Sequence, residues 1–234
     1  DFRRELQRRT RGHPLFVTEQ LRNMQERGNL VQDAAGRWVQ GPSLDWNALP
    51  ARVEGVLEER INRLRRELQD LLTVASIEGE TFTVQVVGRM QKLEERQLLR
   101  TLTQELDRQH RMVSEEGSER LGATRISQFR FRHQMFQKYF YDQIGPSERA
   151  LLHEDVATVL EALYAGRTDK VAAQLARHYE LAGLHDRAAA YFLQAGRNAL
   201  AMHAHSEATA LAEKGIAALK RLDDVSGQTE VLLE

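Results

Sequence analysis

His133 is the residue of this sequence whose type and position are best suited to binding chemistry. It stands in FRFRHQMFQKYFYD, residues 129–142, where an alternating strand pattern gives way to the spacing of a helix. An imidazole has an ordinary pKa of about 6.5, and at a helix start it can donate a hydrogen bond to a phosphate that the outward-pointing backbone N–H groups also attract. The competing interpretation is that His133 caps the helix or packs within its domain.

A second candidate is the turn TRGHP, residues 10–14. Gly12 permits a positive φ, while Pro14 disfavours helical backbone at His13 and suits the first turn of the helix that follows. Most helix-to-helix turns of this kind are structural, so the turn alone indicates no chemistry.

The remaining histidines are predicted to be structural. His153 and His178 stand among the apolar residues of two expected helices. His203 and His205 are two residues apart, so on one helix their side chains would diverge by roughly 200° and could not share a metal ion. We therefore expect no metal site.

Several kinds of catalysis are excluded by what the sequence lacks. It has no cysteine, which removes disulfides, thiolate zinc sites and thiol nucleophiles. The adjacent glutamates at 58–59, 94–95 and 115–116 suit solvated surfaces better than acid-base catalysis. Neither a Gly-x-Ser-x-Gly elbow nor a phosphate-binding Gly-x-x-x-x-Gly-Lys-[Ser/Thr] loop occurs. We expect that this chain alone is not an enzyme.

The composition is that of a globular protein that stays out of membranes. Hydrophobic residues make up 41% of the 234 residues and charged residues 29%, and the formal net charge is −1. No apolar run approaches the roughly 18 residues that span a bilayer. The charged start DFRRELQRRT has no initiator Met and no signal core, so we interpret it as a cut inside a longer protein. The absence of cysteine fits a cytoplasmic location.

The expected fold is mainly α, in three parts. Residues 1–64 form a helical subdomain that includes a small β-hairpin, with Leu30-Val31 and Trp38-Val39 flanking a turn. Residues 65–145 read as helix, short extended segment, two more helices and a two-stranded ribbon with a polar loop, which is the order of a winged-helix domain. Residues 146–234 read as tetratricopeptide-like (TPR-like) helical hairpins, in a truncated array.

Two side-chain patterns support the later parts of this prediction. One is the aromatic set of the helix after His133, which we expect to dock the wing onto the following helices: Phe136, Tyr139, Phe140 and Tyr141. The other is the small-and-aromatic pattern of a helical repeat, in two overlapping copies: Tyr179, Gly183, Ala188, Phe192 and Ala195, then Gly196, Ala208, Ala212 and Gly215.

The whole chain resembles a known family. The segments that carry the resemblance occur in one order: TRGHPLFVTEQL, a tryptophan hairpin, LPARVEGVLEERINRL, FRFRHQMFQKYFYD, ERALLHEDVATVLEAL and LARHYELAGLHDRAAAYFLQAG. This order is similar to the C-terminal half of bacterial STAND-type ATPases (signal-transduction ATPases with numerous domains), relatives of the plant NB-ARC resistance proteins. The resemblance is strongest to those fused to nucleotide-cyclase, LuxR-type or other transcriptional output domains.

The resemblance implies a nucleotide site shared with a P-loop domain upstream of this chain. Gly12 and Pro14 match the family's Gly-x-Pro motif, whose proline packs near the base. His133 falls where NB-ARC relatives carry Met-His-Asp, whose histidine contacts the phosphates of ADP. Only the histidine is shared, since Arg132 and Gln134 replace its neighbours. ATP or ADP with Mg²⁺ would be the cofactor of the full-length protein, and this fragment would hold none by itself.

The resemblance further implies a regulatory function. The winged helix would close over ADP, a protein partner or ligand would act on the TPR-like array, and activation would permit oligomerisation. A DNA-binding winged-helix regulator and a pure interaction scaffold remain as alternatives. The expected recognition helix, LEERQLLRTLTQELDRQ, follows Lys92 and mixes four acidic residues with several arginines, which argues against direct DNA binding.

Overall fold

The chain is mainly helical, with one two-stranded and one three-stranded sheet, as the sequence predicts. The computed structural model describes residues 2–50, 52–122 and 124–231, and the side chains of these except Asn47 and residues 223–231. It divides into two compact units, Asp1–Gln69 and Asp70–Glu234, and each is described by itself. The three-part division predicted above stays a prediction. No helix in the described part of the chain has the length and apolar character needed to cross a bilayer.

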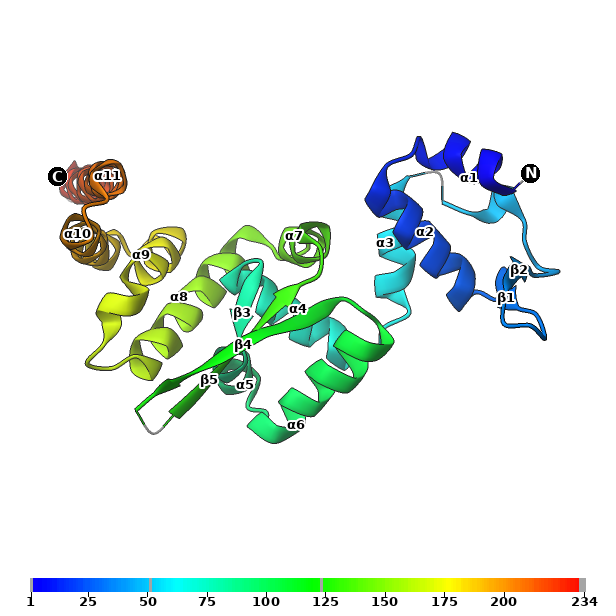
Figure 1. Cartoon of the computed structure of the whole chain (residues 1–234). Coiled ribbons are helices and arrows are strands. Elements are labelled where there is room, and N and C mark those ends of the chain that lie inside the picture. The colour runs from blue at the N-terminus through cyan, green and yellow to red at the C-terminus, as the bar shows by residue number, and fades with distance from the viewer. Residues whose placement is uncertain (1, 51, 123, 232–234) are drawn as a thin grey trace. The chain divides into compact units, whose positions relative to one another are not determined.

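The first unit is a small helical domain with a hairpin (Figure 1). Its elements are α1 Phe2–Thr10, α2 Pro14–Glu26, β1 Leu30–Gln32, β2 Trp38–Gln40, the 3-10 turn η1 Trp46–Ala48 and α3 Val53–Asn62. The hairpin turn closes as predicted, because Gly36 takes φ 75° and donates its N–H to the carbonyl of Asp33. Met24, Leu30 and Leu49 form the apolar centre.

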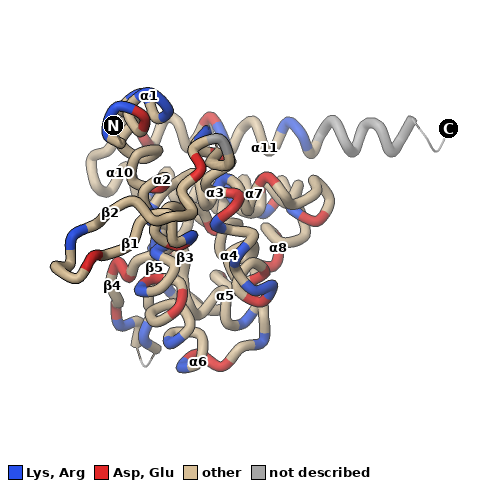
Figure 2. Tube along the Cα trace, turned by 90° about the vertical axis from the view of Figure 1, so that its right-hand side faces the viewer, with Lys and Arg blue, Asp and Glu red and all other residues tan. Residues whose placement is uncertain are grey.

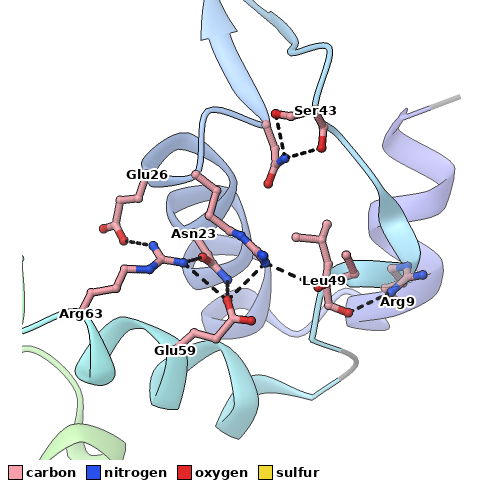
Figure 3. Close-up of polar contacts among 10 residues, drawn as sticks. Arg9, Asn23, Glu26, Ser43, Leu49, Glu59 and Arg63 are labelled. Carbon is pink, nitrogen blue, oxygen red and sulfur yellow. Dashed lines mark hydrogen bonds and ion pairs between the residues drawn. The ribbon is translucent and has the colours of Figure 1, made fainter.

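Polar contacts fasten α2 to α3 (Figure 3). Asn23 donates to Glu59 at 2.8 Å and accepts from Arg63 at 2.6 Å, and Arg63 also pairs with Glu26 at 3.0 Å. Deeper in the unit, Glu19 and Arg60 form an ion pair with side chains only 3% and 2% exposed. These contacts hold α2 and α3 in a defined register, so their N-terminal ends are held together as well.

A winged-helix domain forms the first part of the second unit, whose boundary at Asp70 falls inside the first helix of this domain. Its elements are α4 Arg66–Glu78, β3 Thr81–Thr83, α5 Val84–Gln91, α6 Glu95–Arg100, the π-helix η2 Thr101–Gln109, β4 Val113–Leu121 and β5 Thr124–Phe131. The sheet is antiparallel in the order β3-β5-β4. Figure 1 shows these strands beside α4, α5 and α6. This order of helices and strands is the one that the sequence predicts.

The sheet differs from the prediction in two respects. The expected two-stranded ribbon has a third strand, because Phe82 of β3 pairs with Phe129 of β5 and both rings are fully buried. The expected polar loop is also mostly strand, since pairing continues to Leu121 and Thr124 and the chain turns at Gly122 with φ 62°. Pairing across the hairpin satisfies the backbone of these polar residues, which single-sequence polarity does not reveal.

Helices make up the rest of the second unit. They are α7 Gln134–Asp142, α8 Pro146–Leu163, the 3-10 turn η3 Thr168–Val171, α9 Ala172–Leu181, α10 His185–Ala201 and α11 His205–Val231. A Cβ on Gly215 would lie 3.4 Å from that of Phe192, so a small residue allows α10 and α11 to pack closely. Glu161 of α8 accepts hydrogen bonds from Tyr179 of α9 and Tyr191 of α10, each at 2.6 Å.

One apolar core joins the winged-helix domain to the array. It contains Ile77, Val86 and Ile126 from the former and Leu160 and Tyr179 from the latter. The predicted docking role of the aromatic helix is consistent with this packing. Phe136 and Phe140 are buried, and the hydroxyl of Tyr141 lies 3.0 Å from Nε2 of His153 on α8.

The Glu19–Arg60 pair provides a test of the first unit. We expect Glu19→Ala to reduce the unfolding free energy of this unit by about 3 kcal/mol, because it leaves Arg60 buried without its main partner. Both tryptophans, Trp38 and Trp46, belong to this unit, so urea unfolding followed by tryptophan fluorescence reports on it selectively. Arg37→Ala, which removes an exposed pair with Asp33, is the matched control and should leave the unfolding free energy nearly unchanged. Equal losses in the two variants would contradict the assignment.

Candidate functional site

The turn between α1 and α2 has the conformation that its sequence predicts. Arg11 and Gly12 both take positive φ, 51° and 72°, and the chain then enters α2 at Pro14. His13 is the N-cap residue of α2, and its Nδ1 accepts a hydrogen bond from the N–H of Phe16 at 3.4 Å. Gly12, His13 and Pro14 are all exposed, so the turn is open to a ligand.

A cavity of about 570 Å³ opens beside this turn. It is lined by Arg8, Arg9, Thr10, Arg11, His13, Phe16, Arg52, Val53 and Glu54. Two helices begin at its wall, since His13 caps α2 and Arg52 is the N-cap residue of α3. Helix N-termini carry partial positive charge and unsatisfied N–H groups, so both ends favour an anion in this cavity.

Only some of the arginines in the cavity wall are neutralised. Glu5 binds Arg8 at 2.5 Å and Arg9 at 3.0 Å. The hydrogen bond from Arg8, followed by that from Arg9, lowers the pKa of Glu5 to about 2, so this carboxylate stays ionised. Arg9 also lies over the Trp46 ring at 5.8 Å.

The side chains of Arg11 and Arg52 have no hydrogen bond or ion pair within the described residues. Glu54 is the one acidic residue of the cavity wall, and it forms no ion pair with either arginine in the described part of the chain. The cavity thus combines two uncompensated guanidinium groups with an apolar floor at Phe16 and Val53. This chemistry suits a ligand that has both an anionic and a flat apolar part.

His133 lies in the second unit, whereas Gly12 and Pro14 lie in the first. It follows β5 and is the half-buried N-cap of α7, with Nδ1 accepting from the N–H of Met135 at 3.1 Å. The capping interpretation left open by the sequence therefore describes one role of this residue. Its neighbour Arg132 connects the end of β5 to Asp107 of η2 and to the carbonyl of Val113 in β4.

Two histidines expected to be structural form a buried pair that sequence spacing does not reveal. Nδ1 of His153 on α8 lies 2.8 Å from Nδ1 of His178 on α9, and both rings are fully buried. Nε2 of His178 is buried and has no partner within the described residues. Because a buried N–H without an acceptor is costly, we assign the proton of the His178 ring to Nδ1 and leave Nε2 unprotonated. His178 then donates to His153, and His153 donates to the oxygen of Tyr141.

Burial and nearby arginines keep this pair neutral. Burial first, and then Arg177 and Arg149, lower the pKa of His153 to about 4. Burial, the neighbouring His153 and Arg177 lower the pKa of His178 to about 3. Glu78 at the end of α4 is also buried, which raises its pKa to about 7, although it accepts from the N–H of Thr83 at 2.8 Å.

The single helix assumed in the sequence for His203 and His205 is not what the structure has. His203 precedes α11 and takes φ 59°, so the two residues do not share a helix, and their ring centroids are 6.3 Å apart. Within the described residues, no group of three or more His, Asp or Glu side chains is placed to hold a metal ion.

Comparisons with protein-family models, with curated proteins and with solved structures found no match for this chain.

The buried titratable groups predict how the stability of the second unit depends on pH. Both histidines have folded-state pKa values below the unfolded value of about 6.5, so the unfolded chain gains protons first and stability falls as pH falls from about 6.5 toward 4. Glu78 acts in the opposite direction, because its pKa is raised on folding. Each group contributes about 1.4 kcal/mol per pH unit, so we expect a net loss of about 2 kcal/mol between about pH 6.5 and 5.

Urea unfolding followed by far-UV circular dichroism, with tryptophan fluorescence to identify the first unit, measures this dependence. Glu78→Gln removes the group that opposes the two histidines, so this variant should lose about twice as much unfolding free energy on acidification as the parent chain does. The exposed His203→Gln is the control and should leave the profile unchanged. A stability that is constant or rises on acidification would contradict the assignment.

Proposed function

We propose that this chain is the nucleotide-state-sensing, autoinhibitory and protein-interaction region of a bacterial, cytoplasmic STAND-type signalling ATPase, and that a P-loop domain in the same protein completes its nucleotide site. The observation that carries the proposal is the cationic cavity beside the Gly12–Pro14 turn. The resemblance selects the same turn from sequence order, and the cavity is found there independently of that resemblance.

The residues of this cavity fit a nucleoside diphosphate. Phe16 and Val53 offer apolar surface for a base, and Arg11 and Arg52 offer charge for phosphates. Gly12 and Pro14 are exposed in the adjoining turn but are not part of the cavity wall. The chain has no Walker A loop, so Mg²⁺ and the remaining phosphate contacts would come from the P-loop domain. This region would then respond differently to a bound diphosphate and a bound triphosphate.

His133 has two roles in this proposal. It caps α7, and in the closed, ADP-bound state it adds a contact to the phosphates. Because β5, His133 and α7 belong to the winged-helix domain, a contact there would couple the nucleotide state to the position of that whole domain. ATP exchange would then favour an open state that oligomerises.

The helical array is the proposed input surface. Leu193 and Leu200 on α10, and Ile216 and Leu219 on α11, are each more than half exposed. A cavity of about 560 Å³ between η3, α10 and α11 includes Lys170, Asn198, Met202 and Leu211 in its wall. Helical repeats bind partners on such surfaces. A pure scaffold would give no role to the uncompensated arginines of the first unit.

Two substitutions of His133 separate capping from sensing. In the full-length protein we expect His133→Ala to accelerate ADP release about tenfold and to raise basal output, and also to destabilise the second unit by about 1 kcal/mol through loss of the cap. His133→Asn retains a capping side chain, so it should restore stability but not ADP retention. ADP off-rates and urea unfolding measure the two effects. Normal ADP retention in the Asn variant would show that His133 is only a cap.

The uncompensated arginines provide a second test. We expect Arg52→Ala and Arg11→Ala each to weaken ADP binding by the full-length protein about tenfold, the amount typical of one charge-assisted hydrogen bond. Arg37→Ala, which alters an exposed arginine of the same unit that is paired with Asp33, is the matched control. Calorimetric titration with ADP measures the affinities. Unchanged affinity in both test variants would disprove a role for this cavity.

A further inference from the structure

The exposed face of the third helix of the winged-helix domain is basic. Arg96, Arg100, Gln104 and Arg108 follow one another at intervals of four residues along α6 and η2, and all are exposed. On the opposite side, Leu98, Leu102 and Leu106 are buried at 1%, 0% and 0% exposure. We call the four exposed residues the basic face. Figure 2 shows that acidic residues also occur along this part of the chain.

Contacts within the molecule occupy the acidic residues of the same helix. Glu94 caps α6 by accepting from the N–H of Gln97 at 2.8 Å, and Glu95 accepts from Gln85 of α5 at 2.8 Å. Asp107 pairs with Arg132 at 2.5 Å, and Glu105 also has an intramolecular partner. Asp107 is thus neutralised by Arg132, whereas Glu94 and Glu95 bind neutral groups and remain exposed at the N-terminal end of α6.

The arginines of the basic face have no acidic partner. The side chains of Arg96 and Arg100 form no hydrogen bond or ion pair within the described residues. Arg108 contacts the side-chain oxygen of Gln104 at 3.4 Å, which carries no charge. Three guanidinium groups on one side of a helix repel one another unless an anion lies between them.

The wing adds two more arginines whose side chains have no hydrogen bond or ion pair in the part of the chain that the structure describes. Arg120 of β4 and Arg125 of β5 are directly opposite in the hairpin register, an arrangement that like charges disfavour. With Ser118 and Glu119 they line a hollow of about 380 Å³. Glu119 is engaged by the array, because it accepts from Tyr164 at 3.3 Å and lies 3.9 Å from Nζ of Lys170.

We propose that the winged-helix domain binds duplex DNA, with the basic face on α6 and η2 and the arginine pair of the wing contacting its phosphates. An α-helix fits the major groove of B-form DNA. The major groove of duplex RNA is deep and narrow, so side chains cannot reach the base edges there. The basic face contains no aromatic residue, so it lacks the stacking surface that single strands prefer. The amide of Gln104 is the group on this face that can contact a base edge.

The proposal predicts weak, salt-sensitive binding. Five arginines that each neutralise one phosphate give a slope of about −4.5 for log K against log salt concentration. The net charge of −1 opposes long-range attraction, so we expect a Kd near the micromolar range at about 50 mM salt.

Fluorescence anisotropy with a labelled random 24-base-pair duplex and the 234-residue chain tests this. The triple variant Arg96→Gln, Arg100→Gln, Arg108→Gln should weaken binding at least tenfold and reduce the salt slope by about 2.7. The control triple Arg37→Gln, Arg167→Gln, Arg197→Gln makes the same change of net charge at exposed arginines elsewhere and should bind as the parent does.

Three outcomes would overturn the proposal. The first is no anisotropy change up to about 50 µM protein at about 50 mM salt. The second is an equal loss of DNA affinity in both triple variants. The third is that poly-glutamate, at equal charge, competes as effectively as unlabelled duplex, which would indicate general anion binding. Circular dichroism of each variant confirms that the fold is intact. None of these variants alters the nucleotide cavity, so the result is independent of the proposed ATPase function.

Discussion

The pairing of charges within each unit decides which surfaces of this protein can attract a ligand. Acidic and basic side chains are almost equal in number, so a charged site exists only where pairing is incomplete. Glu5 neutralises Arg8 and Arg9 but leaves Arg11 and Arg52 facing the same cavity. In α6 and η2, capping and ion pairs occupy the acidic residues and leave arginines outside. The two candidate sites therefore have a common physical origin.

The apolar core of the second unit explains how the basic face of the winged-helix domain could be coupled to an input on the array. Ile77 and Ile126 of the winged-helix domain share one core with Tyr179 of the array. The buried polar groups at this junction, His153, His178 and Glu78, satisfy most of their hydrogen-bonding capacity across elements. Because an unsatisfied buried polar group is costly, a shift of α8 or α9 is resisted at the winged helix as well.

Capping links structure to proposed function in both motifs. His13 and His133 each precede a helix and accept a backbone N–H through Nδ1. A residue that caps a helix already stands where N–H groups face outward, which is also where an anion binds. Capping and phosphate sensing are therefore compatible, and a histidine at such a position can report on a ligand while it stabilises its own helix.

Sequence alone determined the class of the fold and most of its elements, because the periodicity of apolar residues and the positions of Gly and Pro are local signals. The hairpin at Asp33 to Gly36, helix α4 and the turn at Gly12 and Pro14 were predicted in this way. Tertiary structure alone decided the third strand, the contact of His153 with His178, the cavity that joins Arg11 to Arg52, and the pairing of Asp107 with Arg132. Each depends on residues far apart in the chain meeting in space, and no local pattern encodes which arginine will find an acidic partner and which will not.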